Sequence, residues 1–143
     1  MLFRSGPLTP YADEVRAVAR ACGVADRVDI RGYIDGPALL ELYRRARLFI
    51  FPSRYEGFGL PPLQALACGL PVVAARIPVL AEVLGECALY ATPGDPSDFA
   101  AACMAALQSP DVAERVERGR ARARAFTWAA VADRMTGVYR KLV

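Results

Sequence analysis

A series of short apolar runs, each leading into a helical pattern, most constrains the fold of this chain. The runs Leu48–Phe51, Leu70–Ala75 and Ala88–Ala91 are nearly continuous, with little polar alternation. A strand that is apolar on both faces belongs to a sheet covered by helices on both sides. The order strand, helix, strand, helix therefore predicts an α/β fold built on a doubly wound parallel sheet.

Other patterns extend this order to both ends of the chain. Before Leu48, the sequence predicts a strand end at Met1–Phe3, a helix at Tyr11–Cys22 stopped by Gly23, a strand at Val28–Ile30 and a helix at Ala38–Ala46. After Asp95 only helices are expected: Pro96–Gln108, an arginine-rich helix to about Ala125, and a last helix with Thr127 as its N-cap. We expect one domain over residues 1–143, truncated at its N-terminal side, with terminal helices over about 96–143.

Composition excludes several classes of protein. The chain has 143 residues, of which 55% are hydrophobic and 23% charged, as in globular proteins, and no stretch reaches the roughly 20 apolar residues of a membrane helix. Met1–Arg4 is too short an apolar start for a signal peptide, which predicts a cytoplasmic protein, or one at the cytoplasmic membrane face when part of a longer chain. The four cysteines are scattered and histidine is absent. We therefore expect no metal and no cofactor, and reduced cysteines in the core.

The basic residues are almost all arginines, because Lys141 is the only lysine. Five of them crowd the predicted helix before Ala125: Arg115, Arg118, Arg120, Arg122 and Arg124. Glu114 and Glu117 interleave with these arginines, and no aromatic stacking platform accompanies them. This pattern favours a solvated helix face with local ion pairs and no nucleic-acid partner, although nucleic-acid binding stays an alternative.

The stretch Tyr55–Ala65 predicts a ligand site. It follows the Leu48–Phe51 strand and carries Glu56 between an aromatic residue and a glycine, before a helix opened by prolines. The first amides of a helix lack intrahelical partners and attract anions or polar sugars. The amides expected to be available are those of Gly57, Phe58, Gly59 and Leu60. Glu56 is the candidate for gripping hydroxyl groups, and the structural alternative is that it caps the helix near Pro61.

The same stretch resembles a known family. Phe51–Ala65, followed by Cys68–Ala74, is similar to the donor-binding signature of family 4 retaining glycosyltransferases with the GT-B fold. The resemblance extends over nearly the whole chain, through Asp26–Val28, Gly32-Tyr33, Leu40–Phe51, Ala81–Val83, Pro93–Asp95 and Phe126–Trp128. It implies a Rossmann-like domain, the C-terminal half of a GT-B architecture, that binds a nucleotide-diphosphate sugar as donor substrate.

The resemblance also implies roles for single residues. Glu56 would be the catalytic residue that hydrogen-bonds hydroxyls of the donor sugar, and the amides of Gly57–Leu60 would bind the sugar and diphosphate. Gly32 and Tyr33 would meet the base. The family's second glutamate, which binds the ribose, is replaced here by Gln64, so we expect weakened nucleotide binding because the charge is lost. The alternative for Gln64 is a first-turn helix residue that reaches exposed amides.

Two parts of the family's machinery have no match in the sequence. The arginine and lysine that neutralise the diphosphate are absent, with Arg4 and Arg76 as the nearest basic candidates, and so is the N-terminal acceptor domain. We expect a donor-binding domain for sugar transfer with retention that is inactive when isolated. The alternative is a non-catalytic binding module or relic.

The last helix suggests a possible self-association. Its apolar residues Trp128, Val131, Met135 and Tyr139 would be exposed in an isolated domain. We expect either a homodimer through this helix or one through an unpaired or borrowed strand edge near Leu2-Phe3.

Overall fold

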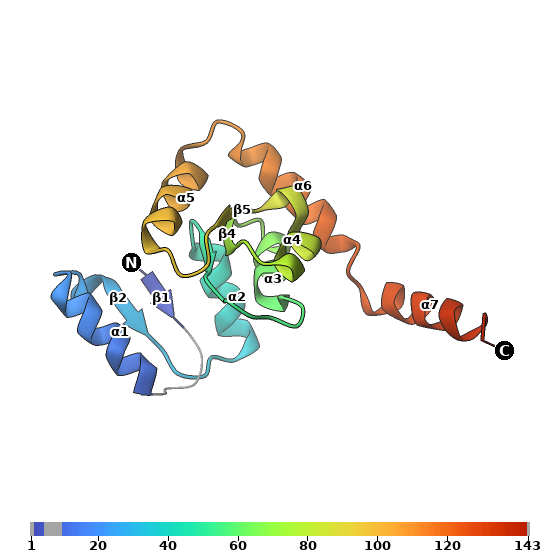
Figure 1. Ribbon diagram of the computed structural model, residues 1–143, viewed down its shortest axis with the longest axis horizontal. Helices are drawn as coiled ribbons and strands as arrows, with labels where there is room; N and C mark the ends of the chain where they lie inside the picture. Colours follow the sequence, from blue (N-terminus) through green and yellow to red (C-terminus); the bar gives the residue numbers. More distant parts are fainter. Residues whose placement is uncertain (1, 5–9, 143) are drawn as a thin grey trace. The chain divides into compact units, whose positions relative to one another are not determined.

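The computed structural model describes residues 2–4 and 10–142 and divides the chain into two compact units, one up to Leu42 and one from Tyr43 (Figure 1). Each unit contains parallel strands and helices in alternation. The predicted α/β class with a parallel sheet is confirmed.

The first unit is a strand, helix, strand arrangement. β1 (Leu2–Arg4) pairs in parallel with β2 (Val28–Ile30), and α1 (Pro10–Ala21) and the 3-10 turn η1 (Ala25–Arg27) connect them. The end of α1 is the predicted one. Gly23 has φ +67°, and Val24 donates to the Ala19 carbonyl at 2.9 Å, which is the glycine-dependent helix stop called the Schellman motif.

Helix α2 (Gly36–Arg45) leads from the first unit into the second. Its start is capped by Asp35, whose carboxylate accepts from the Ala38 amide at 2.9 Å. Near its end, the buried Tyr43 ring meets Phe49 with 5.6 Å between centroids. Burial raises the pKa of the Tyr43 hydroxyl.

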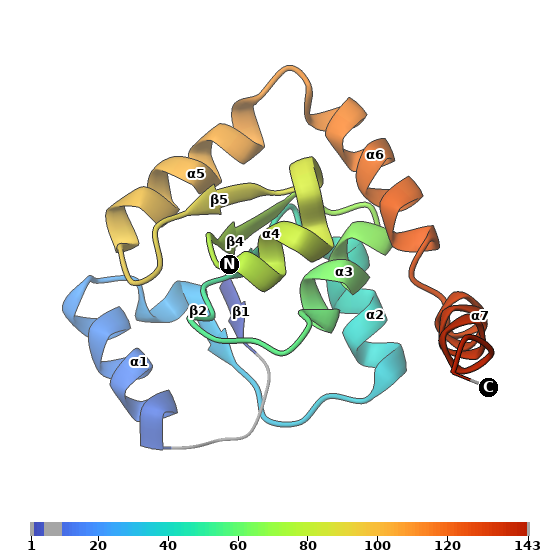
Figure 2. The same ribbon diagram turned by 45° about the vertical axis from the view of Figure 1, so that its right-hand side comes forward.

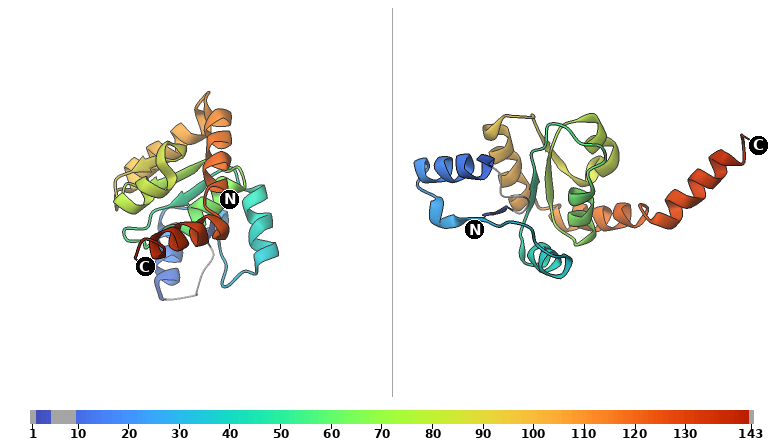
Figure 3. Two further views of the ribbon diagram at one scale, coloured as in Figure 1. Left: turned by 90° about the vertical axis from the view of Figure 1, so that its right-hand side faces the viewer. Right: turned by 90° about the horizontal axis from the view of Figure 1, so that it is seen from below.

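The second unit is built on three parallel strands in the order β3 (Phe49–Phe51), β4 (Val72–Ala75), β5 (Leu89–Ala91). All four residues of β4 are buried, because helices cover both faces. Figure 3 shows α5 (Pro96–Gln108) on one side of these strands and α3 (Leu60–Ala67) and α4 (Pro78–Leu84) on the other. The core contains Leu66, Val72, Val73, Leu80 and Leu84.

Helices alone follow β5 in the described residues, as predicted. After α5 come α6 (Val112–Arg124) and α7 (Trp128–Tyr139), and η2 (Gly85–Cys87) lies earlier, between α4 and β5. Helix α6 crosses close to α3, because a Cβ on Gly119 would lie 2.8 Å from Leu66 Cδ2. Helix α3 ends like α1: Gly69 has φ +80°, and Leu70 donates to the Ala65 carbonyl at 3.0 Å.

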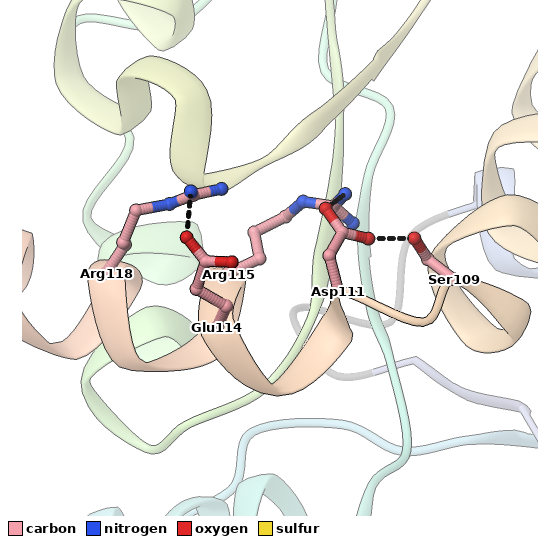
Figure 4. A network of polar contacts seen from close by, with 5 residues as sticks. All are labelled: Ser109, Asp111, Glu114, Arg115 and Arg118. Carbon is pink, nitrogen blue, oxygen red and sulfur yellow. Dashed lines mark hydrogen bonds and ion pairs between the residues drawn. The ribbon is translucent and has the colours of Figure 1, made fainter.

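The predicted ion pairs on α6 are present. Arg118 pairs with Glu114 at 2.8 Å, and Arg120 pairs with Glu117 at 2.6 Å. Figure 4 shows the first of these beside a second cluster, in which Arg115 contacts Asp111 at 2.7 Å and Asp111 accepts from the Ser109 hydroxyl. Local ion pairs thus engage three of the five arginines of this helix, and the absence of a nucleic-acid partner stays a prediction.

Helix α7 has no buried residue. Thr127 is its N-cap, accepting from the Ala130 amide at 3.1 Å as predicted. The side chains expected on its apolar side are exposed, Trp128 at 87% and Met135 at 50%. Dimerisation through this helix stays a prediction, as does a dimer through a strand edge, where β1 pairs with β2 of its own chain.

No helix in the described part of the chain is long and apolar enough to cross a membrane. Within the same residues, no group of three or more acidic residues or cysteines is placed to hold a metal ion. Localisation and the need for a metal stay predictions.

Candidate functional site

Three loops leave the second unit's strands at one edge, because parallel strands share the edge at which they end. They follow Phe51, Ala75 and Ala91, and Figure 2 shows the arrows of β4 and β5 pointing the same way. The Arg76 amide donates to the Ala91 carbonyl at 2.8 Å and joins the second loop to the third. The first loop reaches the third through Arg54, since a Cβ on Gly94 would lie 2.5 Å from Arg54 Nη2.

The segment Tyr55–Leu60, here called the 55–60 loop, carries the predicted donors. Among the described residues, no acceptor contacts the amides of Gly57, Phe58, Gly59 or Leu60. Four successive N–H groups at the start of α3 therefore stay available, and the helix dipole adds positive potential there. This is the arrangement that binds anions and polar ligands through the backbone.

Gly59 sets the shape of the loop. It is the N-cap of α3, with φ +92° and ψ 46°, in the left-handed region that favours glycine. It is also buried against α4, because a Cβ there would lie 2.5 Å from Leu80 Cδ2. Gly57 differs, since nothing lies within 4 Å of the Cβ position at that residue.

Glu56 is half-buried and has no hydrogen-bond or ion-pair partner in the described part of the chain. Helix α3 has no side-chain cap, so the interpretation of Glu56 as a helix cap is not supported. Its carboxylate stays available, four residues before α3 begins.

Gln64 lies in the second turn of α3 and is exposed. Its side chain donates to and accepts from no group among the described residues, so the interpretation in which it satisfies first-turn amides is not supported. Its predicted contact with a ribose stays untested.

The start of α5 is a contrast to the start of α3. Asp95 accepts from the Ser97 hydroxyl at 2.5 Å and the Ser97 amide at 2.9 Å, while Asp98 accepts from the Thr92 amide at 2.7 Å. The hydrogen bond from the Ser97 side chain holds the pKa of Asp95 below its usual value, and hydrogen bonds from Thr92 lower the pKa of Asp98. The amides near the start of α5 therefore already donate to Asp95 and Asp98. Among the described residues, the amides of this edge that lack an acceptor lie mainly at the start of α3.

The two basic candidates named from the sequence, Arg76 and Arg4, belong to different units. Arg76 is exposed and lies over the Tyr90 ring, with 5.4 Å from its Cζ to the centroid. Arg4 belongs to β1 in the first unit. The predicted base-binding pair also lies in the first unit, where Gly32 is half-buried and Tyr33 is 92% exposed.

The sequence did not predict that one aromatic residue, Phe126, and one basic residue, Arg122, lie near the loop. The Phe126 ring meets the Phe58 ring edge to face, with 5.8 Å between centroids. The Arg122 guanidinium lies over the Phe126 ring, with 5.7 Å from Cζ to the centroid. The sequence pattern assigned Arg122 to the solvated face of α6. The spacing of four residues between Arg122, in the last turn of α6, and Phe126, just beyond its end, is a signal that could have indicated their contact.

Solved α/β proteins share this fold. Sucrose-phosphate synthase from Thermosynechococcus elongatus superposes with a TM-score of 0.86 at 31% identity, over 99% of this chain and 38% of that one. The Anabaena protein HepE, solved with UDP and glucose, shares the fold with a TM-score of 0.86 at 21% identity, over 97% of this chain and 40% of that one.

Sequence comparison gives the family. The model described as Glycosyl transferases group 1 matches residues 4–109, and the chain belongs to this family. O-antigen chain mannosyltransferase B of Escherichia coli is 39% identical over 78% of this chain and 29% of the relative. D-inositol 3-phosphate glycosyltransferase of Acidothermus cellulolyticus is 38% identical over 95% of this chain and 31% of the relative. The chain thus spans about a third of the length of these relatives, and the predicted resemblance is confirmed.

Proposed function

We propose that the 55–60 loop binds the donor of a glycosyl transfer, a nucleotide-diphosphate sugar. The observation that carries the proposal is the set of four amides that have no acceptor among residues 2–4 and 10–142, beside the Glu56 carboxylate, which has no partner there either. Membership of the glycosyl transferase family supports it.

The roles follow from the chemistry of each group. The amides of Gly57–Leu60 would donate to oxygens of the sugar and diphosphate, and negative charge that develops on the departing diphosphate would be stabilised by these fixed dipoles. Glu56 would accept from sugar hydroxyls and orient the ring for transfer with retention. Gln64 would accept from the ribose, and Gly32 and Tyr33 would contact the base.

The acceptor would be bound by a further domain. Because the chain spans about a third of its relatives and carries no matched pair of phosphate-neutralising cations, we propose that these 143 residues bind donor but transfer sugar poorly by themselves.

Calorimetric titration with UDP-, GDP- and ADP-sugars tests the proposal. We expect one donor class to bind, and Glu56→Ala to abolish binding because it removes the acceptor for sugar hydroxyls. Glu86→Ala is the matched control, since Glu86 is an exposed glutamate of η2, and it should bind like the wild type. Absence of binding to all three classes would contradict the proposal.

The alternative of a non-catalytic module predicts a different result. A relic would bind no donor or would bind one without dependence on Glu56. A donor that binds equally well to the wild type and Glu56→Ala would therefore favour a binding module.

A further inference from the structure

We propose that Phe126, backed by Arg122, is a positioning residue that holds the 55–60 loop in its donor-binding shape. The inference rests on the proposed function of that loop. It follows from a closed series of contacts that runs from the loop through the end of α6 to α4 and back to the loop.

The first contact restrains Phe58. Glycines flank this residue on both sides, so the local sequence leaves the backbone of the loop free to take several conformations. The Phe58 ring, 41% exposed, meets the Phe126 ring at 73° with 5.8 Å between centroids. Edge-to-face pairs at this distance are favourable, so the contact selects one position of the Phe58 side chain and of the amides beside it.

The second contact supports Phe126. The Arg122 guanidinium lies 5.7 Å from the Phe126 centroid, which is the range of a cation–π contact. The same guanidinium donates from Nε to the Val83 carbonyl at 2.6 Å and from Nη2 to the Glu82 carbonyl. Arg122 therefore fixes the ring of Phe126 to the last carbonyls of α4.

The third contact returns to the loop. Helix α4 is held at its end by Arg122 and also by Tyr90, whose hydroxyl donates to the Gly85 carbonyl at 2.6 Å. Its fully buried Leu80 forms the wall against which Gly59 packs. Gly59 thus packs against α4, and Phe58 packs against Phe126. Arg122 contacts both α4 and Phe126 and so links the two packing partners of the loop.

Loss of the Phe126 ring should weaken donor binding without removing any group that touches the donor. Binding would then have to order the loop, and ordering one side chain raises a dissociation constant by about 2- to 10-fold. The probes are UDP, GDP and ADP, titrated into the full chain by calorimetry. We expect Phe126→Ala to raise the Kd of whichever nucleotide the wild type binds by that factor, and Phe126→Tyr, which keeps the ring, to restore it.

Three further measurements separate positioning from folding. Phe126→Leu keeps apolar volume and should retain the melting temperature while it raises the Kd. The heteronuclear NOE of the Gly57 and Gly59 amides should fall in Phe126→Ala and Phe126→Leu, because these amides become mobile. Trp128→Ala removes an aromatic residue that is 87% exposed and should change neither quantity.

Each outcome either supports or overturns the positioning role of Phe126. A wild-type chain that binds none of the three nucleotides overturns the proposed function and this inference with it. A wild type that binds, together with unchanged Kd values in Phe126→Ala and Phe126→Leu, overturns only the positioning role. A raised Kd in both variants with rescue by Phe126→Tyr supports it.

Discussion

At the scale of single residues, the two glycines of the 55–60 loop have different tasks. Gly59 combines a positive φ with a close approach to Leu80, whereas Gly57 faces open space. Gly59 is therefore required by the conformation of the loop. Gly57 has room for a side chain among the described residues.

This difference predicts a large effect on stability for one alanine variant and a small one for the other. Gly59→Ala should lower the free energy of unfolding by about 1–3 kcal/mol, because it forces a side chain into a strained backbone region and against Leu80. Gly57→Ala should stay within about 0.5 kcal/mol of the wild type. Urea denaturation followed by circular dichroism measures both, and equal losses would contradict the assigned roles.

Gln64 gives a second prediction at this scale. If its amide oxygen accepts from the ribose, Gln64→Glu should lower the Kd of the bound nucleotide by about fivefold, because a charged acceptor forms the stronger hydrogen bond. Gln108→Glu, at the end of α5, is the matched control for the added charge. A Kd unchanged or raised in Gln64→Glu would argue against a ribose contact.

At the scale of helices, the crossing of α6 over α3 depends on a residue without a side chain. Gly119 is buried at the crossing, and Leu66 lies within 2.8 Å of the position that its Cβ would take. The crossing matters for function because α6 carries Arg122 toward α4 and leads into Phe126.

A larger residue at this crossing should separate the two helices. Gly119→Leu should cost about 1–3 kcal/mol of unfolding free energy through overpacking. Gly137→Leu is the matched control on α7, where nothing lies within 4 Å of the Cβ position, and it should not lower stability because leucine favours a helix more than glycine does. Similar losses in both variants, measured by chemical denaturation, would mean that Gly119 has no special packing role.

Much of the secondary structure could be predicted because its signals are local. Apolar runs marked the strands, Gly23 marked a helix end, and Thr127 marked a helix start. Gly57 and Gly59 also indicated the 55–60 loop, whose amides from Gly57 to Leu60 have no acceptor among the described residues. These features depend on residues that lie a few positions apart.

The supports of the loop could not be predicted, because they join residues far apart in the chain. Arg122 contacts a carbonyl 39 residues earlier, and Phe126, between α6 and α7, meets Phe58 in the 55–60 loop. Charge patterning described Arg122 only as one member of a solvated face. The division into two compact units was likewise not visible in the sequence, since composition does not change at Leu42.

At the scale of the whole molecule, acid should destabilise the protein through three carboxylates. Hydrogen bonds from the side chains of Ser97, Thr92 and Ser109 lower the pKa values of Asp95, Asp98 and Asp111 respectively, with Arg115 also lowering that of Asp111. A pKa that is lower in the folded state gives stability that is present above the unfolded value of about 4 and is lost as pH falls through the folded value.

The melting temperature should therefore be steady from pH 7 to about pH 5 and fall below about pH 4. Asp95→Asn combined with Asp98→Asn should reduce this fall, because the two carboxylates no longer titrate. Asp133→Asn removes a carboxylate from the exposed helix α7 and serves as the control. An acid slope identical in the double variant and the wild type would contradict the assignment.

The exposure of α7 has a practical consequence for labelling. Lys141 is the only lysine of the chain, lies two residues beyond the end of this helix and has an exposed side chain. An amine-reactive fluorophore at mildly alkaline pH therefore has a single ε-amine to modify. A dye at that position would report on what approaches α7 while leaving the 55–60 loop unmodified.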